Sequence, residues 1–543
     1  MRALPGLLGI ATLLAACAPY ADVREKQPSL AGASGLGPLA DAEQAIGRAL
    51  HRDHVDPLKA LGDCLGAMEI ALRTLRQNPE SAPARRDYNF ALGRVFEIIH
   101  EAGLNPWTQP LHVPGPSGGF LLTYSADPHA ERHPSRCDFT PADQFDVRGR
   151  YVSQRVTRAG LGAPLVAIER DIHRQARESF APSRLFYGLT GVAQFQGRRC
   201  VLALKDPLAD ETTQLDGHTY ALAADFTAPL AVMLEKTDPK KHELSRLLNP
   251  EKFAHTAAIE RLQPYDPNKT IVLVIHGLMD SQATWIPMIN ALRGEPLIRK
   301  HYQFWFYSYP SGYPYPYSAA ILREELDAVE KRFPARKPMV VIGHSMGGCI
   351  SRLLITDSGD RLWMTIFGRP PNEVPLSAHT RAYFEEELFF HHRPEIGRVI
   401  FIAAPLRGSD LASGWFGQLA ASFIHPAKIA SQASQEMLRL TSVRENELKP
   451  KRRANSVDTL SPKSRFVNAI NTIPIMPGIP YDTIIGDRGR HDSPNSSDGV
   501  VPYWSSHLDG AEIEDIVPSS HTAHQNPQAI AEVLHILKIH ALQ

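Results

Sequence analysis

A serine flanked by glycines stands where an apolar run meets a helix-like pattern. In the stretch PMVVIGHSMGGCISRLL, Ser345 is the centre of a Gly-His-Ser-Met-Gly pentad. Residues 339–342 predict a short buried strand, and the apolar residues after the pentad recur at the spacing of one helix face. A chain that passes from strand to helix with almost no loop must turn sharply, and Gly343 and Gly347 remove the side chains that would collide there. The pattern therefore predicts a nucleophilic serine at the apex of a tight turn.

A serine hydroxyl needs a base within hydrogen-bond reach and an acid to orient that base. With this strand-turn-helix motif the acid follows the serine in the chain. The segment YDTIIGDRGRHDSPNSSDGVVP has an apolar strand at 483–485 and then a polar loop with three aspartates. We choose Asp498, because Gly499 permits a tight turn and VVP re-enters packed structure. Asp487 and Asp492 are the alternatives.

The base is expected in the last loop of the chain. A strand is predicted at 513–517, and Pro527 can begin the closing helix. Two histidines lie between these elements. His521 comes directly after the strand and is our choice, whereas His524 lies nearer the helix start and is the alternative.

Acyl transfer also needs hydrogen-bond donors for the oxyanion that forms when a carbonyl is attacked. Residues 271–275 form a buried-strand pattern that ends in His-Gly, so the chain turns where the strand ends. We assign one backbone donor to Leu278, with Met279 as the fallback, and the other to Met346, the residue after the serine. His276 is interpreted as structural.

Together these segments resemble an α/β-hydrolase of the lipase and esterase type, over residues 270–542. The resemblance includes HG after a strand, GHSMG at the turn, DGVVP for the acid, and AAPLRGSD at 403–410, which is similar to the TPHRGS segment of many bacterial lipases. Leu406 stands where histidine is common. The resemblance implies a mostly parallel sheet flanked by helices, and hydrolysis of acyl esters by water through an acyl-enzyme. It also implies no metal or organic cofactor, and a catalytic triad of Ser345, Asp498 and His521.

Composition indicates a globular protein without a dedicated nucleic-acid surface. The 543 residues are 43% hydrophobic and 21% charged, which suits two or three domains. Lys plus Arg and Asp plus Glu each number 58, so the net charge is zero. This balance argues against nucleic acid as a partner and against general electrostatic attachment to anionic lipid.

The N-terminal sequence predicts that the protein is located in the cell envelope. Residues 1–16 have a positive charge and a short apolar run, as in a signal peptide. The residues LAAC at 14–17 resemble a bacterial lipobox, which implies lipidation of Cys17. Because Ala18 is not the aspartate that retains enterobacterial lipoproteins at the inner membrane, the outer membrane of a bacterial cell is expected. Plain secretion is the alternative.

The remainder of the chain is divided by composition and periodicity. Residues 17–40 are interpreted as a flexible tether, 41–105 as paired helices, 106–237 as an α+β accessory region, 238–269 as a linker and 270–543 as the catalytic domain. The last accessory strands are expected to join the edge of the catalytic sheet. No partner is visible for residues 41–237.

Several smaller features leave alternatives open. The mature part contains four cysteines, Cys64, Cys137, Cys200 and Cys349, which permit several disulfide connectivities. Cys137 and Cys200 lie in the same region and can pair. Cys349 is expected to be a buried free thiol. Residues 411–465 are either a lid or pocket wall or a helix packed on the core. The aromatic run at 302–318 is interpreted as a buried strand and its exit loop, and the alternative is that Tyr309 and Tyr313 line the mouth of the crevice.

The hypothesis that best joins these patterns is a lipid-anchored serine hydrolase that acts on acyl esters. An acyltransferase or amidase with the same triad is the alternative among enzymes. A non-catalytic envelope interaction protein on a hydrolase scaffold is the alternative among other classes, but an intact set of nucleophile, acid, base and oxyanion turn argues against it.

Overall fold

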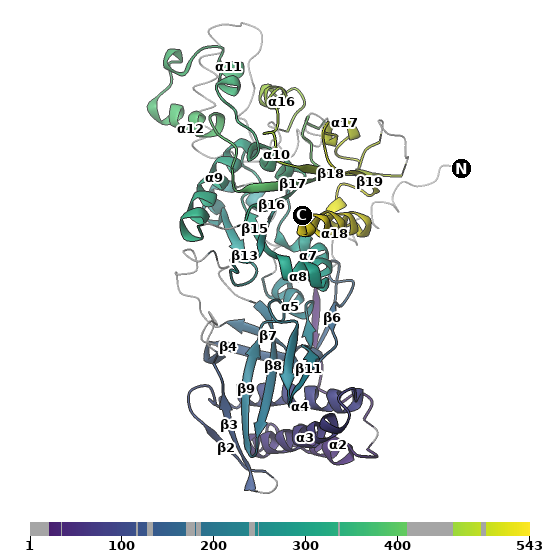
Figure 1. Ribbon diagram of the computed structural model, residues 1–543. Helices are drawn as coiled ribbons and strands as arrows, with labels where there is room; N and C mark the ends of the chain where they lie inside the picture. Colours follow the sequence, from purple (N-terminus) through teal and green to yellow (C-terminus); the bar gives the residue numbers. More distant parts are fainter. Residues whose placement is uncertain are drawn as a thin grey trace, which may run out of the picture. The chain divides into compact units, whose positions relative to one another are not determined.

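The computed structural model (Figure 1) describes residues 21–33, 35–115, 118–126, 134–169, 180, 186–237, 245–247, 249–334, 337–409, 460–489 and 496–543. The chain divides into two compact units. The first contains Met1–Asp238 together with Asn290–Lys300, and the second contains Pro239–Ile289 and His301–Gln543. Cys17, Asp492 and residues 411–459 of the candidate lid segment lie outside the described residues.

The first unit contains three consecutive long helices: α2 (Ala40–Arg52), α3 (Pro57–Gln77) and α4 (Ala82–Glu101). Two of them begin with strong start signals. The Asp56 side chain accepts the Lys59 N–H before α3, and the Ser81 hydroxyl accepts the Ala84 N–H before α4. A proline in the first turn of each helix adds to the signal.

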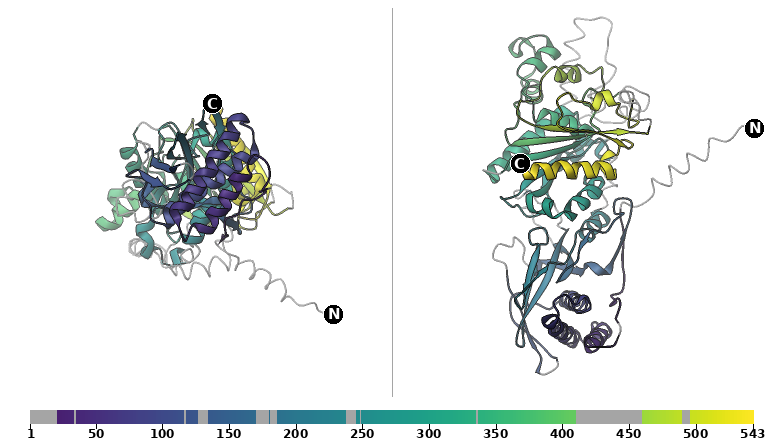
Figure 2. Two further views of the ribbon diagram at one scale, coloured as in Figure 1. Left: turned by 90° about the horizontal axis from the view of Figure 1, so that it is seen from below. Right: turned by 45° about the vertical axis from the view of Figure 1, so that its right-hand side comes forward.

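A six-stranded sheet packs against these helices. Its order is β2-β3-β9-β8-β7-β4. The strands are β2 (Leu111–Val113), β3 (Phe120–Tyr124), β4 (Cys137–Pro141), β7 (Ala163–Glu169), β8 (Phe186–Gln196) and β9 (Arg199–Lys205). Figure 2 shows the three helices on one face of the sheet, and one buried core joins both layers. The predicted helical and α+β regions therefore share a single core.

Shorter elements complete the first unit. They are β1 (Asp22–Glu25), β5 (Phe145–Arg148), β6 (Thr157–Arg158), β10 (Thr212–Leu215), β11 (His218–Ala221), β12 (Ala224–Asp225) and α5 (Ala228–Thr237). Strand β1 pairs antiparallel with β5. The expectation of a flexible tether up to residue 40 is therefore wrong for the residues of β1, which are held by a ladder of backbone hydrogen bonds.

The second unit is built on a seven-stranded sheet of order β13-β15-β14-β16-β17-β18-β19. Its strands are β13 (Ala258–Arg261), β14 (Thr270–Ile275), β15 (Tyr302–Ser308), β16 (Met339–His344), β17 (Ile396–Ile402), β18 (Tyr481–Asp487) and β19 (Glu514–Pro518). Only the β13–β15 pair is antiparallel in this sheet. Strand β13 lies inside the segment predicted as a linker, so the sheet begins earlier than expected. Among the described residues, no strand of the accessory region joins this sheet, so the expected joining of its last strands is wrong.

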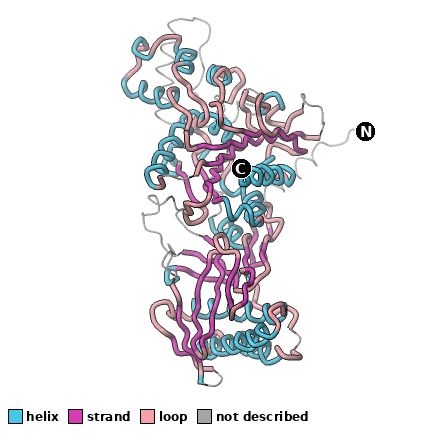
Figure 3. The backbone as a smooth tube through the Cα atoms, viewed as in Figure 1, coloured by secondary structure: helices cyan, strands magenta, loops and turns pink. Residues whose placement is uncertain are grey.

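Helices lie between and after the strands of this sheet along the chain (Figure 3), and two of them contain most of Asn290–Lys300, which belongs to the first unit. They are α7 (Ile286–Gly294), α8 (Pro296–His301), α9 (Tyr315–Arg332), α10 (Met346–Leu353), α11 (Arg361–Phe367), α12 (Ala378–Leu388), α16 (Arg465–Asn471), α17 (Tyr503–Ser506) and α18 (Pro527–Leu542). Short 3-10 turns lie at Pro250–Thr256, Gln282–Trp285 and Ala523–Gln525. Among these described helices, none combines the length and the apolar character needed to cross a bilayer.

The parallel strands bring four loops to one edge of the sheet. Ile275 at the end of β14 pairs with Gly343 of β16, and His344 at the end of β16 pairs with Ile402 of β17. β18 and β19 end side by side in the same direction. The loops that follow β14, β16, β18 and β19 therefore meet, and these loops carry the predicted chemistry.

The cysteines are not paired as the sequence allowed. None of the four cysteines in the described part of the chain forms a disulfide, and all four are buried. Cys137 lies on β4 and Cys200 on β9, with β7 and β8 between them. Three strand spacings of about 4.8 Å separate these strands by about 14 Å, too far for an S–S bond. The thiol of Cys137 instead lies 3.0 Å from the hydroxyl oxygen of Tyr187.

Candidate active site

Ser345 stands at the apex of a strained turn between β16 and α10. Its φ of 53° and ψ of −125° lie in a region that L-residues rarely adopt. The turn is possible because the flanking positions carry no side chain. A Cβ at Gly343 would lie 2.6 Å from the carbonyl oxygen of Gly347, and a Cβ at Gly347 would lie 2.2 Å from the carbonyl oxygen of Ile275. The Ser345 N–H donates to the Ile402 carbonyl at 3.0 Å, which anchors the turn to β17.

The structure brings the predicted serine, histidine and aspartate into one hydrogen-bonded chain. The Ser345 hydroxyl donates to Nε2 of His521 at 2.8 Å, and Nδ1 of His521 donates to Oδ2 of Asp498 at 2.7 Å. Asp498 is 2% exposed. Its other carboxylate oxygen accepts the N–H groups of Val500 and Val501, both at 2.7 Å. The Asp-Gly-Val-Val turn thus orients the carboxylate toward the imidazole ring.

The described alternatives to these residues lie elsewhere. Asp487 ends β18, and its carboxylate accepts the N–H of Gly489 at 3.1 Å. His524 lies in the 3-10 turn after β19, buried against the ring of Trp285 at a centroid distance of 4.9 Å. Among the described residues, neither Asp487 nor His524 forms a hydrogen bond with Ser345.

The turn after β14 passes directly beside the serine. A Cβ at Gly277 would stand 2.9 Å from Cβ of Ser345, so only glycine permits this approach. Met279 has a φ of 54°, and its N–H donates to the Ser311 hydroxyl oxygen at 3.1 Å. That amide is therefore engaged, which leaves Leu278 as the candidate donor on this turn. Met346 is the first residue of α10, where a helix has N–H groups without intrahelical partners.

His276 acts as a structural residue in the same turn, as its sequence position indicated. Its ring stacks on Tyr309 at 4.4 Å, and Nε2 accepts the Tyr309 N–H at 3.3 Å. Burial lowers the pKa of His276, which favours the neutral ring. Tyr309 and Tyr313 are themselves 1% and 2% exposed and follow β15, which agrees with the interpretation of this run as a buried strand and its exit loop.

The AAPLRGSD segment supports the serine turn from the side of β17. A Cβ at Gly348 would lie 2.4 Å from Cβ of Ala404, so the segment packs tightly on the start of α10. The Cys349 thiol donates to the Pro405 carbonyl at 3.5 Å, and burial raises the pKa of that thiol. Leu406, which replaces the more common histidine, is buried.

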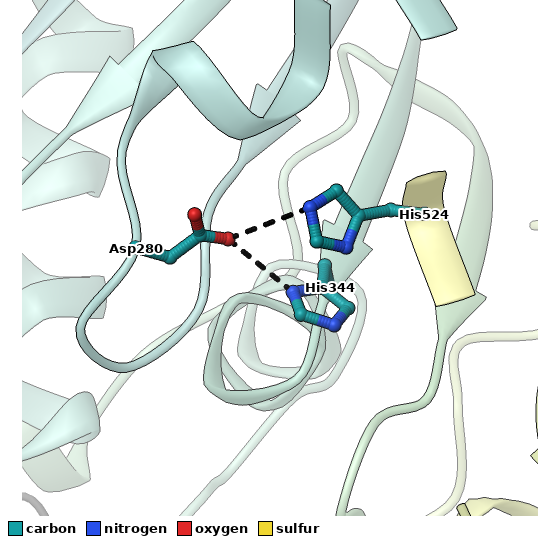
Figure 4. Close-up of side chains that lie close together, drawn as sticks. All are labelled: Asp280, His344 and His524. Carbon is teal, nitrogen blue, oxygen red and sulfur yellow. Dashed lines mark ion pairs between the residues drawn. The ribbon is translucent and has the colours of Figure 1, made fainter. Parts of the chain in front are cut away.

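One group of side chains beside the triad was not foreseen from the sequence. Asp280, His344 and His524 place a carboxylate oxygen and two ring nitrogens within 4.8 Å of one another (Figure 4). Asp280 and His524 lie in the loops that carry a candidate oxyanion donor and His521, and His344 ends β16 directly before Ser345. Their nearness to those residues in the chain is the only sequence signal that marks them. Among the described residues, these three side chains have potential ligand atoms close enough together to bind one metal ion, judged only by the distances between those atoms.

Comparison with known proteins agrees with this architecture. Residues 271–533 match the model of the alpha/beta hydrolase family. The second unit has the α/β-hydrolase fold. The predicted fold class is therefore confirmed, with the helical and α+β unit ahead of it.

Solved structures similar to the chain include three bacterial or metagenomic hydrolases. The Bacillus licheniformis lipase BlEst2 in mature form is 17% identical, with a TM-score of 0.32, over 52% of this chain and 98% of that one. The metagenomic carboxyl esterase MGS0156 is 14% identical, with a TM-score of 0.29, over 55% of this chain and 90% of that one. Phospholipase PlaB from Legionella pneumophila is 16% identical, with a TM-score of 0.30, over 50% of this chain and 59% of that one. No curated protein sequence matches the chain significantly.

Proposed function

We propose that this protein is a serine hydrolase that cleaves carboxylic esters, with acyl or lipid esters as the substrate class. One observation carries the proposal. The side chains of Ser345, His521 and Asp498 form a continuous hydrogen-bonded chain of 2.8 Å and 2.7 Å. This arrangement gives a serine hydroxyl the base and the orienting acid that it needs to act as a nucleophile.

The chemistry begins with transfer of the Ser345 hydroxyl proton to Nε2 of His521. The serine oxygen then attacks the ester carbonyl, and the resulting oxyanion is stabilised by the backbone N–H groups of Leu278 and Met346. The intermediate collapses, the bond to the alcohol oxygen breaks, and His521 protonates the departing alcohol. Asp498 stays ionised and holds the imidazole in the required tautomer.

Water completes the cycle on the acyl-enzyme. His521 takes a proton from the water, the hydroxyl attacks the acyl carbon, and the same two N–H groups stabilise the second oxyanion. Collapse releases a carboxylic acid and returns the proton to Ser345. The nucleophile, base, acid and oxyanion donors all belong to the chain, and water is the only co-substrate.

A fluorophosphonate probe and p-nitrophenyl esters of graded chain length test this proposal directly. The wild-type protein should be labelled at Ser345 and should turn over the esters. Ser345→Ala should lose labelling and turnover by several orders of magnitude, because only residual oxyanion and binding effects remain. Ser464→Ala, just before α16, is the matched control and should behave as wild type. A folded wild-type protein that the probe does not label, or turnover retained by Ser345→Ala, would overturn the proposal.

The same assay separates ester hydrolysis from related acyl chemistry. A p-nitroanilide of the preferred acyl group and a long-chain alcohol are added in parallel reactions. We expect slower release from the anilide and free acid as the main product. Faster anilide cleavage, or transfer of the acyl group to the alcohol in preference to water, would replace the hydrolase proposal with an amidase or an acyltransferase.

We also propose that the protein is anchored in the bacterial cell envelope through lipid on Cys17. The support is the LAAC sequence at 14–17 after a short apolar run. Several acyl chains on one cysteine give lasting attachment, because each buried methylene contributes roughly 0.8 kcal/mol. Such an anchor would present the second unit to ester substrates near a membrane surface.

A further inference from the structure

The side chains of Asp280 and His344 join the three loops on which the proposed catalysis depends. Asp280 follows Leu278 and Met279 in the turn after β14. His344 is the last residue of β16 and immediately precedes Ser345. His524 lies three residues after His521, in the 3-10 turn before α18. Figure 4 shows the two imidazole rings turned toward the Asp280 carboxylate from different elements.

The polar atoms of this cluster are buried, and only some of them have hydrogen-bond partners. Oδ1 of Asp280 accepts the Ser281 N–H at 2.8 Å and the Thr284 hydroxyl at 2.5 Å. Oδ2 faces Nδ1 of His344 at 3.5 Å and Nε2 of His524 at 3.8 Å. Among the described residues, Oδ2 of Asp280 and Nδ1 of His344 have no hydrogen-bond partner within normal length. A buried carboxylate is stabilised by donors or by a positive neighbour, and the His344 ring is the histidine closest to Oδ2.

The surroundings of the His344 ring identify that neighbour. Nε2 of His344 lies 2.8 Å from the backbone carbonyl oxygen of His521, and Nδ1 faces the Asp280 carboxylate. A carbonyl and a carboxylate can only accept, so a ring that donates to both of them carries a proton on each nitrogen. This imidazolium form of His344, which the ion pair proposed below requires, is paired with Asp280 and bonded to the main chain of the base.

The ionisation of the other two groups agrees with this assignment. Burial opposes the charge on Asp280, but the neighbouring histidine rings, His344 foremost, together outweigh it and hold the pKa of the carboxyl well below its usual range. Burial, together with the nearby His344, holds the pKa of His524 well below its usual range, so His524 is neutral. One negative and one positive charge then balance inside the cluster.

We propose that Asp280 and His344 are positioning residues for the proposed hydrolase, in which their buried ion pair fixes the His521 backbone and so sets the imidazole of His521 against Ser345. The inference rests on the function proposed above. The ion pair ties the oxyanion turn to the serine turn, and the His344–His521 bond ties the serine turn to the loop of the base. A displacement of about 1 Å between reacting groups can cost about a hundredfold in rate, which gives such a brace a measurable effect.

A hydrogen-bond donor beside His524 argues against a metal ion in this cluster. The side-chain amide nitrogen of Gln525 lies 3.2 Å from Nε2 of His524. An N–H donor at that point uses the lone pair that a metal ion would need. With that ligand engaged, Asp280 and His344 alone are too few for a structural zinc site.

Kinetics on single and double variants test the proposal. Asp280→Asn and His344→Gln should each lower kcat and the rate of fluorophosphonate labelling about tenfold to a hundredfold, with KM changed less than threefold. The double variant should lose little more than either single variant, because the two residues act as one unit. Asp357→Asn is the matched control: it breaks a His392–Asp357 pair of 2.9 Å in the same unit and should leave kcat unchanged. Unchanged kcat in Asp280→Asn, or a double variant whose losses multiply, would overturn the proposal.

A spectroscopic measurement separates this inference from the proposed function. In protein labelled with ¹⁵N-histidine, His344 should show two protonated ring nitrogens, and His521 should show a low-field Nδ1–H signal from its bond to Asp498. Both features should persist in the Ser345→Ala protein and should be lost or displaced in Asp280→Asn. A neutral His344 ring, or a low-field His521 signal that Asp280→Asn does not change, would overturn the inference whether or not the wild-type protein hydrolyses esters. Stoichiometric metal in the purified protein, bound through these residues, would also overturn it.

Discussion

Arg398 on β17 holds Asp482 on β18 through two hydrogen bonds of 2.7 Å, from Nε and Nη2 to the two carboxylate oxygens. Both side chains are almost completely buried between neighbouring parallel strands. Because removal of Asp482 leaves the buried Arg398 with only the half-exposed Glu512 carboxylate, at 2.9 Å, as a charged partner, Asp482→Asn should lower the free energy of unfolding by up to about 3–5 kcal/mol. Urea unfolding followed by circular dichroism measures this change.

An exposed ion pair in the same unit provides the control. Asp327 is 70% exposed and pairs with Arg393 at 2.6 Å. Asp327→Asn should cost less than about 1 kcal/mol, since solvent screens exposed pairs. Equal losses in Asp327→Asn and Asp482→Asn would contradict the role given to burial.

The backbone at the serine turn predicts a second result. In Gly347→Ala the new Cβ would lie 2.2 Å from the Ile275 carbonyl oxygen and 2.6 Å from that of His276, which are main-chain atoms of β14 and its turn. We expect a loss of at least about 1–3 kcal/mol in stability, together with loss of ester turnover. Gly47→Ala is the contrasting variant: it lies inside α2 with no atom within 4 Å of an added Cβ, and it should stabilise the protein by about 0.5–1 kcal/mol.

Paired variants distinguish the acid and the base from their neighbours. His521→Ala and Asp498→Asn should each reduce kcat by at least about a thousandfold, because the serine loses its base or the tautomer of that base. His524→Gln and Asp487→Asn should stay within about tenfold of wild type. If His524→Gln were the inactive variant of the two histidine changes, the assignment of the base would be wrong while the serine mechanism survived.

Glu387 predicts a change of stability with pH. Burial raises the pKa of this carboxyl on α12 to about 8, although Tyr383 and Arg323 favour the charged form. The native state therefore keeps a proton that the unfolded chain releases above its ordinary value of 4.5. Stability should fall as pH rises from about 4.5 to about 8, by up to about 1.4 kcal/mol per pH unit from this group.

Chemical unfolding at pH 5, 6, 7 and 8 checks this slope. Glu387→Gln should flatten it, because the amide resembles the protonated acid at every pH. Glu386→Gln, a change at the exposed neighbour, should leave the slope as in wild type. A slope that survives in Glu387→Gln would show that another group carries it.

The predicted lipid anchor can be measured in cells. Cys17→Ser should abolish partitioning into detergent and should accumulate unprocessed precursor, because the modified thiol is required before cleavage at a lipobox. Fractionation of the wild-type protein should place it with the outer membrane. If Cys17→Ser were processed and distributed as the wild type, the cysteine would be incidental and secretion would be the better interpretation.

Local signals explain why much of the site could be predicted from the sequence. Ser345 is marked by its own glycines, and Asp498 and His521 each follow a strand whose end must lie at the same edge of a parallel sheet. The cluster around Asp280 could not be predicted, because its members come from one strand end and two loops that only the assembled sheet brings together. A buried ion pair has no local pattern in the chain.

Pairing between distant segments explains the failed expectations. Strand β1 has only four residues, so it cannot be told from an irregular segment until β5 is placed beside it. Cys137 and Cys200 lie in one region of the sequence, but the strand order sets them apart. Strand β13 lies in a charged stretch with prolines on both sides, which hid a short antiparallel edge strand.

The first unit includes Asn290–Lys300, a piece of chain that lies within the sequence of the hydrolase fold. In that unit the Thr227 hydroxyl donates to the Asn290 side-chain oxygen at 2.7 Å, and the buried guanidinium of Arg299 bonds both carboxylate oxygens of Glu211 at 2.7 Å and 2.9 Å. A gene fragment that starts after residue 238 would encode Arg299 without its acceptor. The two units are therefore not modules that recombination can exchange at a single junction, and substitutions at Glu211 and Arg299 should be inherited as a pair.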